Sequence, residues 1–214
     1  MKNLNRPQPP HCLSLYKNGT HKWDDVTPEH KQLIWDSLYG MQGEFCAYCE
    51  CKLIDRKKHI EHFVQKGKDS SKTFTWDNLF GSCKYIDRCG VYKDTQKYNA
   101  VDLIKADIDK PESFFCFLTD GSIKPRRDLS PLEERRAEVT IKVFRLDQQL
   151  KQIRFSFIQP HVDNAEYLYS LIEDLSKDEW LELVNEELDS LEGLPFYSAI
   201  KSVFMSPQQY DTTI

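Results

Sequence analysis

The sequence contains no run of about 18 apolar residues, so it predicts no helix that crosses a membrane. Its first ten residues are polar and proline-rich, and they lack the apolar core of a signal peptide. Internal repeats and low-complexity tracts are also missing. With 40% hydrophobic and 12% aromatic residues among 214, the chain can bury a core. We therefore expect a globular cytoplasmic protein with no membrane contact.

The cysteines do not have the number or the spacing of a disulfide framework. There are seven, an odd number, and four of them form two local pairs, Cys46 with Cys49 and Cys83 with Cys89. Two residues between thiolates let both sulfurs reach one tetrahedral ion, and a second pair can close the site. The pattern predicts a structural zinc ion held by these four. The others are interpreted as ordinary thiols: Cys12, Cys51 and Cys116.

An acid–histidine pair, Glu61 and His62, lies between the two cysteine pairs. A histidine that is neutral near pH 7 can take a proton from water, and a carboxylate is a hard oxygen ligand for Mg²⁺. Neighbouring side chains on a strand face opposite sides, so both can reach one phosphate only at a strand end or a bulge. The pair predicts phosphodiester hydrolysis with His62 as general base and Glu61 as ligand of Mg²⁺ or another divalent cation.

Charge of one sign is concentrated in one segment rather than spread along the chain. Residues 166–192 carry ten acids and one lysine, a net of −9, so the other residues sum to −5 + 9 = +4. Residues 124–154 carry nine basic and five acidic residues. This basic belt predicts phosphate contacts, with Arg126 and Arg127 as candidates, or else a solvated helical face. The acidic segment would repel nucleic acid, so it either faces a partner protein or keeps a helical bundle soluble.

Periodicity, capping residues and turn signals predict several helices and two short hairpins. A helix is expected from Thr27 to a stop at Gly40, and a capping box at Ser130 opens another. Hairpins are expected over residues 52–64 and 114–123, with a loop and short helical turn over residues 73–80. Further helices are expected over residues 148–158, 164–175, 176–191 and 195–204. These elements predict a metal-bound ββα core wrapped by helices.

The motifs resemble the HNH endonuclease superfamily, and more closely the PtuB-like HNH nucleases of retron and Septu anti-phage defence systems. The resemblance runs through residues 45–50, 60–63, 74–83 and 89–94. It implies an α+β fold with a zinc-bound ββα-metal (HNH/His-Me finger) core, an N-terminal helix and a mostly helical C-terminal half. We expect residues 1–125 to hold the nuclease core, with the zinc module at 45–94, and residues 126–214 to form a partner-binding helical region.

The resemblance also implies roles and partners. Asn78 would hold the metal loop or orient His62, and the protein would be the toxic effector of a complex with a PtuA-like ABC-type ATPase. In retrons a reverse transcriptase and its multicopy single-stranded DNA would join the complex. The nucleic-acid substrate is DNA or RNA, since metal and histidine act on the phosphate and do not read the sugar.

Two departures from the superfamily pattern stand out. Gly90 follows the last cysteine, where the superfamily has histidine or asparagine, and glycine has no side chain to bind a metal. Asp94 or His59 could replace that ligand, and Lys93 could contact the phosphate. Gln65 stands where proline is common.

A zinc-stabilised nucleic-acid-binding or protein-docking module without catalysis is the alternative function. It needs the cysteines but not the acid–histidine pair. Trp76 is interpreted as a core anchor rather than a base-stacking platform, and Asp77 as a turn or cap residue.

Overall fold

The computed structural model describes residues 1–205, and the remaining nine lie outside the described part. The α-helices are α1 (Pro28–Gln42), α2 (Cys89–Lys93), α3 (Pro131–Phe144), α4 (Gln148–Ile158), α5 (Val162–Ser170), α6 (Lys177–Leu191) and α7 (Tyr197–Met205). The strands are β1 (Lys58–His62), β2 (Leu79–Cys83), β3 (Phe115–Phe117) and β4 (Ile123–Pro125). The 3-10 helices are η1 (His11–Leu15), η2 (Trp23–Asp25), η3 (Ser70–Lys72), η4 (Trp76–Asn78), η5 (Ala100–Asp102), η6 (Pro111–Ser113) and η7 (Gln159–His161). No helix among residues 1–205 is long and apolar enough to cross a bilayer.

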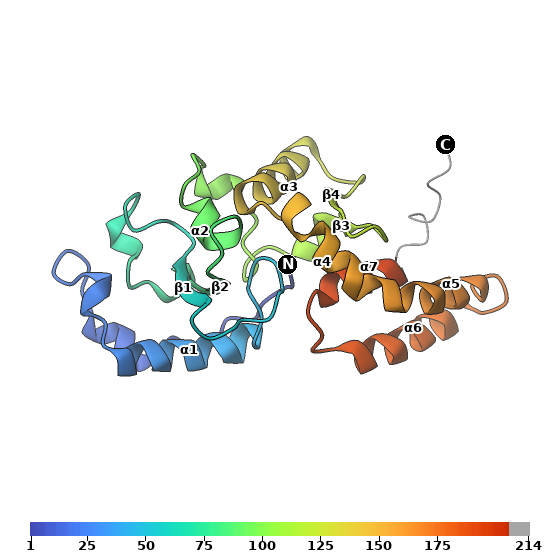
Figure 1. The fold of residues 1–214 in the computed structure, drawn as a ribbon, viewed down its shortest axis with the longest axis horizontal. Helices are drawn as coiled ribbons and strands as arrows, with labels where there is room; N and C mark the ends of the chain where they lie inside the picture. Colours follow the sequence, from blue (N-terminus) through green and yellow to red (C-terminus); the bar gives the residue numbers. More distant parts are fainter. Residues whose placement is uncertain (206–214) are drawn as a thin grey trace.

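Helices and two small sheets build an elongated molecule (Figure 1). Each sheet is a two-stranded antiparallel pair, β1 with β2 and β3 with β4. The α+β class expected from the sequence is confirmed at this level. Helix α2 packs on β2 and against α3, while α1 contacts β2.

β1 and β2 carry the acid–histidine pair. Glu61 lies opposite Phe80, and His62, the last residue of β1, lies opposite Leu79. Every residue of β2 is buried, which makes it the inner strand of the pair. His62 therefore stands where the strand ends, the position at which neighbouring side chains can converge.

The hairpin predicted over residues 52–64 is wrong, because β1 pairs with β2 and not with the segment before it. That segment turns back onto the start of the cysteine loop. Phe45 forms an isolated bridge with Lys52, and the Leu53 N–H donates to the Glu44 carbonyl at 2.7 Å. Since these bonds close the loop around Cys46 and Cys49, β1 takes its partner from further along the chain.

Helix α1 begins as predicted but ends later. Thr27 Oγ1 accepts a hydrogen bond from the His30 N–H at 3.2 Å, with proline in the first turn. The helix passes through Gly40 and stops at Gly43, whose φ of 64° is a left-handed conformation that favours glycine. The added residues place Gln42 against β2, where its amide donates to the Gly81 carbonyl at 2.8 Å and accepts from the Gly81 N–H at 2.9 Å.

Two local signals in the second half are confirmed. The hairpin β3–β4 turns through Asp120 and Gly121, and Gly121 has a φ of 81°. The capping box at Ser130 opens α3, with the Glu133 N–H donating to the serine hydroxyl and the Glu133 carboxylate accepting from the Ser130 N–H. Helix α4 has the predicted bounds of 148–158.

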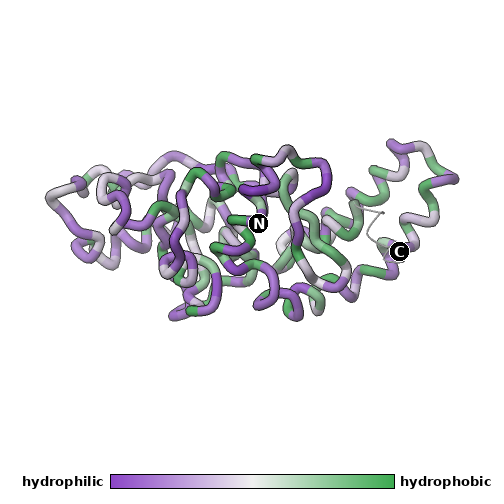
Figure 2. Tube along the Cα trace, turned by 90° about the horizontal axis from the view of Figure 1, so that it is seen from above, coloured by the Kyte–Doolittle hydropathy of each residue, from purple (hydrophilic) through white to green (hydrophobic). Residues whose placement is uncertain are grey.

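The C-terminal helices form a pair, α5 and α6, closed by α7. The helix predicted over 164–175 begins earlier, at Val162, because Pro160 lies in η7 and the chain continues directly into α5. It ends at Ser170. Trp180 of α6 joins the pair, since its Nε1 donates to the Leu168 carbonyl at 2.8 Å. The pair stands at one end of the molecule (Figures 1 and 2), with hydrophilic and hydrophobic stretches alternating along it.

Candidate active site and metal centre

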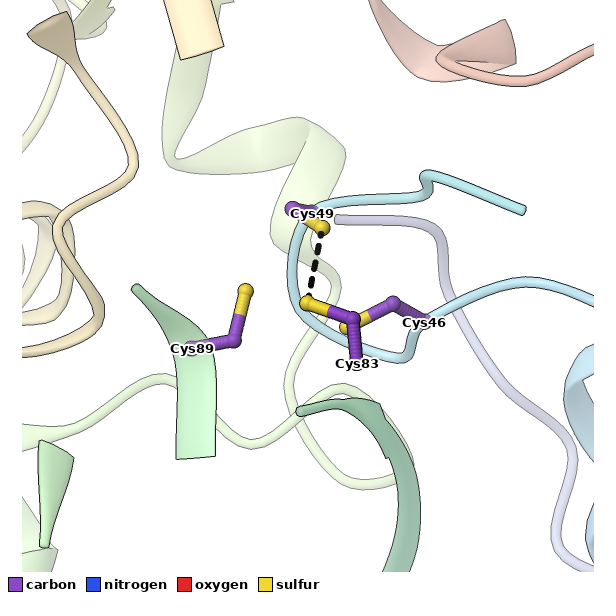
Figure 3. A group of neighbouring side chains, drawn as sticks. All are labelled: Cys46, Cys49, Cys83 and Cys89. Carbon is purple, nitrogen blue, oxygen red and sulfur yellow. Dashed lines mark hydrogen bonds between the residues drawn. The ribbon is translucent and has the colours of Figure 1, made fainter. Parts of the chain in front are cut away.

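Four cysteines form a buried cluster that fits zinc (Figure 3). The sulfurs of Cys46, Cys49, Cys83 and Cys89 all lie within 4.8 Å of one another, and the Cys49 and Cys83 sulfurs are 3.9 Å apart. A tetrahedral ion with Zn–S bonds of about 2.3 Å separates its sulfurs by about 3.8 Å. The donor set and its spacing fit one zinc ion, held by the four residues predicted from the sequence.

Three separate pieces of chain bring the thiols together. Cys46 and Cys49 lie on a tight loop in which the Glu50 N–H donates to the Cys46 carbonyl at 2.9 Å, and Glu50 has a φ of 63°. Cys83 ends β2, and Cys89 is the first residue of α2. Gln42 also donates to the Phe45 carbonyl, so one amide joins the loop to β2.

A further thiol lies beside the cluster. The Cys51 sulfur is 3.2 Å from the Cys49 sulfur, but Cys51 is half-buried and is not part of the four-residue set. Cys12 is buried in η1, and its thiol contacts the His30 carbonyl at 3.7 Å.

The His62 ring is held in one orientation. Its Nε2 lies 3.0 Å from the Thr73 carbonyl oxygen. A carbonyl can only accept, so Nε2 carries the proton in the neutral ring and Nδ1 keeps a lone pair. Burial, and after it the positive charge of Lys66, lowers the pKa of His62 to about 4. The ring is therefore neutral at neutral pH.

Trp23, from the N-terminal arm, covers His62. The two rings meet edge to face with centroids 4.5 Å apart, and only 6% of the His62 surface is exposed. The Lys66 ammonium lies over the Trp23 ring, 5.8 Å from its centre. The sequence does not predict this contact, since no local pattern connects residue 23 to residue 62.

Glu61 points to the opposite side of β1 and is buried against α2. Its Oε1 lies 2.7 Å from the Lys93 ammonium, and both side chains are almost fully buried. Burial raises the pKa of Glu61 to about 7, although the Lys93 charge opposes that rise. A Cβ on Gly90 would lie 2.4 Å from Glu61 Oε2, so the carboxylate fills the space that a side chain at position 90 would need.

Lys93 is placed inside the fold rather than on a nucleic-acid surface. Its ammonium donates to the carbonyls of His62 and Phe63 and to the Tyr98 hydroxyl at 2.9, 3.1 and 3.0 Å. Asp94 Oδ1 lies 2.8 Å away and belongs to a carboxylate side chain that is 45% exposed. The structure thus brings Glu61, Lys93 and Asp94 together beside the end of β1.

Asn78 holds the chain that leaves β1. Its Oδ1 accepts from the Val64 N–H at 2.7 Å, and its Nδ2 donates to the carbonyls of Val64 and Lys72, both at 3.0 Å. The amide therefore contacts backbone on both sides of the loop, and it makes no hydrogen bond to His62. Of the two roles expected for Asn78, these contacts favour holding the loop.

The other sequence candidates lie in different surroundings. His59 shares a strand face with Glu61, and its buried Nε2 has no hydrogen-bond partner among the described residues. Trp76 is buried and donates to the Pro7 carbonyl at 2.8 Å, as expected of a core anchor. Arg126 and Arg127 are exposed and follow β4, a strand that lies well away from β1 in Figure 1.

Much of the basic belt is paired within the fold. Arg136 donates to both carboxylate oxygens of Asp109, at 3.0 and 2.7 Å. Lys151 contacts Asp120 at 2.6 Å, and Arg154 is buried with its Nε donating to the Gly121 carbonyl. These cations stabilise contacts between segments, which leaves fewer of them for phosphate than the sequence count suggests.

We expect Gly90→Ala to displace the Glu61 carboxylate and destabilise the protein by about 1–3 kcal/mol, because overpacking a buried site forces its neighbours apart. Zinc content should stay at the wild-type level. Gly67→Ala is the matched control, since a Cβ there meets nothing within 4 Å. Thermal unfolding with zinc analysis measures both effects, and equal melting temperatures for the two variants would contradict the packing of Glu61 on Gly90.

Comparison with known proteins supports the resemblance read from the motifs. No family model matches the chain. The chain is 30% identical over 124 residues to "Septu protein PtuB" of Bacillus thuringiensis, a match that covers 53% of this chain and 45% of that protein. It is 29% identical over 144 residues to "Retron Vc95 putative HNH endonuclease" of Vibrio cholerae, covering 66% of this chain and 68% of the relative. The similarity to PtuB-like HNH nucleases is thereby confirmed, and it supports a nuclease.

Proposed function

We propose that this chain is a PtuB-like HNH nuclease that hydrolyses phosphodiester bonds of DNA or RNA in a metal-dependent reaction. The observation that carries the proposal is the His62 ring, fixed by the Thr73 carbonyl so that Nδ1 has a free lone pair, at the end of the strand that carries Glu61. The similarity to a Septu PtuB protein and to a putative retron HNH endonuclease supports the same proposal.

In this proposal His62 Nδ1 takes the proton from the attacking water. The ring is neutral because burial lowers its pKa, and the Thr73 carbonyl fixes its tautomer and orientation. Asn78 acts through the loop it holds, which makes it a positioning residue. β1, β2 and α2 together would form the ββα-metal core, with the zinc cluster as its structural support.

The oxygens around Lys93 suit a hard divalent cation. The ammonium is itself a cation standing among two carboxylates and two backbone carbonyls, the ligand types that Mg²⁺ and Mn²⁺ prefer. Glu61 and Asp94 would hold such an ion. When bound, it would stabilise charge on the scissile phosphate and on the leaving oxygen.

A zinc-stabilised binding module without catalysis is the competing function, and cleavage separates the two. Purified zinc-loaded chain should cut total DNA or total RNA when Mg²⁺ or Mn²⁺ is added, and it should not cut when the divalent ion is omitted. The assay is run with and without the proposed ATPase partner. Tight nucleic-acid binding without cleavage under every condition would favour the binding module.

We further propose that the chain is the toxic effector of a defence complex with a PtuA-like ABC-type ATPase, joined in a retron by a reverse transcriptase and its multicopy single-stranded DNA. The acidic pair α5–α6 is the surface proposed for docking. Leu183 is 38% exposed, while Val184 and Leu188 are buried. Tyr167 of α5 and Ile172, in the turn between α5 and α6, are also exposed. Acids around exposed apolar residues suit a partner with a basic rim.

Charge reversal tests this surface. The triple variant Glu182→Lys, Glu186→Lys and Glu187→Lys should bind the ATPase about tenfold more weakly or worse, with a changed salt dependence. A matched triple variant at the other end of the molecule, Asp24→Lys, Glu29→Lys and Asp36→Lys, also reverses three exposed or partly exposed acids and should bind normally. Equal affinity and salt dependence for both variants would mean that the acids only keep the helices soluble.

A further inference from the structure

Five oxygen atoms surround the Lys93 ammonium within 3.1 Å. They are Glu61 Oε1, Asp94 Oδ1, the carbonyls of His62 and Phe63, and the Tyr98 hydroxyl. An ammonium has three N–H donors, so it cannot make a directed hydrogen bond to every one of them. Its three hydrogen bonds go to the two carbonyls and the Tyr98 hydroxyl, which leaves the carboxylate oxygens Glu61 Oε1 and Asp94 Oδ1 as ion-pair contacts. Glu61 Oε1 is in addition buried, with no hydrogen-bond partner among the described residues.

The number and type of these atoms match a cation shell better than an ammonium site. Hard divalent ions take six or more oxygens from carboxylates, carbonyls and water. When both carboxylates are ionised they carry two negative charges against the one positive charge of Lys93, so a dication would balance the shell and the ammonium does not. Gly90 contributes by leaving room for the Glu61 carboxylate next to α2.

The shell is closed around Lys93 and open at Asp94. Lys93 has no exposed side-chain surface, while the Asp94 side chain is 45% exposed. The rim also holds Tyr98 and Lys68, whose ammonium lies 3.3 Å from the centre of the Tyr98 ring. An ion from solvent can therefore reach Asp94 first, and Lys93 has the flexible four-carbon stem needed to withdraw.

We propose that Lys93 is an internal cation that occupies this oxygen shell, and that a divalent ion binds Glu61 and Asp94 only by displacing the Lys93 ammonium. The proposal deepens the proposed nuclease function, because Glu61 is its metal-binding residue. It makes the free chain a weak binder of divalent ions. Any event that draws Lys93 out of the shell, such as contact with a phosphate of the substrate, would favour loading of the ion.

Mn²⁺ binding by the zinc-loaded full chain tests the proposal directly. Electron paramagnetic resonance of free Mn²⁺ gives the affinity without any need for cleavage. Lys93→Met should bind one Mn²⁺ per chain at least about tenfold more tightly than wild type, and adding Glu61→Gln should abolish the gain. Lys68→Met is the matched control, since it removes a positive charge at the rim of the shell. If Lys93→Met binds no better than Lys68→Met, the proposal is overturned.

A second measurement uses the unmodified chain, so it holds even where Lys93→Met fails to fold. Lys93 should resist an amine-acetylating reagent in the absence of divalent ions and become acetylated at saturating Mn²⁺, as read by peptide mass spectrometry. Saturation with Mn²⁺ while Lys93 stays protected overturns the proposal. Displacement of Lys93 without any cleavage would instead reject the nuclease and keep the ion exchange, so the two failures are distinguishable.

Discussion

Replacing Cys49 with serine is expected to release the zinc ion and unfold residues 45–94. Structural zinc contributes an apparent binding free energy of about 10–16 kcal/mol, against about 5–15 kcal/mol for the stability of a whole domain. The four sulfurs join the cysteine loop, the end of β2 and the start of α2, and all four residues are buried. Without the ion these segments lose the contact that fixes them relative to one another.

The neighbouring Cys51 supplies the control. Its sulfur lies 3.2 Å from that of Cys49, yet it is outside the four-residue set, so Cys51→Ser should keep about one zinc per chain and near wild-type stability. Zinc content by mass spectrometry and thermal unfolding measure both variants. Equal zinc loss in the two variants, or a Cys49→Ser chain that keeps its zinc, would contradict the assignment of ligands.

His62→Ala is expected to reduce cleavage by about 100-fold or more, the scale of losing a general base. Zinc content should not change, because His62 makes no contact with the cysteine cluster. The melting temperature should fall only modestly, through the lost packing of the ring on Trp23. Activity and zinc binding are therefore expected to separate in this variant.

The companion variant is His59→Ala, three residues earlier and on the face of β1 that carries Glu61. It should retain far more activity than His62→Ala, because no water-activating role is proposed for it. Single-turnover cleavage with zinc analysis compares the two. A reversed order of effects would move the base to His59, and zinc loss in His62→Ala would make His62 a structural residue.

The sequence predicts well those features that depend on neighbouring residues. The capping box at Ser130 and the Thr27 cap are formed by side chains that bond backbone three residues away. The spacing of Cys46 and Cys49 is also a local feature, since two intervening residues let both thiolates reach one ion. The end of α1 is not predicted correctly, because a glycine can lie inside a helix when the next turn packs on another element. Here the turn after Gly40 brings Gln42 onto β2.

The features that the sequence missed depend on partners far along the chain. The strand expected to pair locally pairs with residues 79–83, because the preceding segment is used to close the cysteine loop. Lys93 has the charge of a phosphate-binding residue, and only the fold places it against Glu61. Trp23 lies 39 positions before His62 (62 − 23 = 39), and no periodicity connects them.

The most direct test of phosphodiester hydrolysis by activated water is cleavage in water enriched in oxygen-18. The zinc-loaded chain is incubated with Mg²⁺ or Mn²⁺ and with the proposed ATPase partner, and the products are separated and weighed by mass spectrometry. We expect a 5′-phosphate that carries one solvent oxygen and a free 3′-hydroxyl, since the 3′ oxygen is the leaving group. A product phosphate without solvent oxygen, or a cyclic phosphate from RNA, would contradict the attack of water activated by His62.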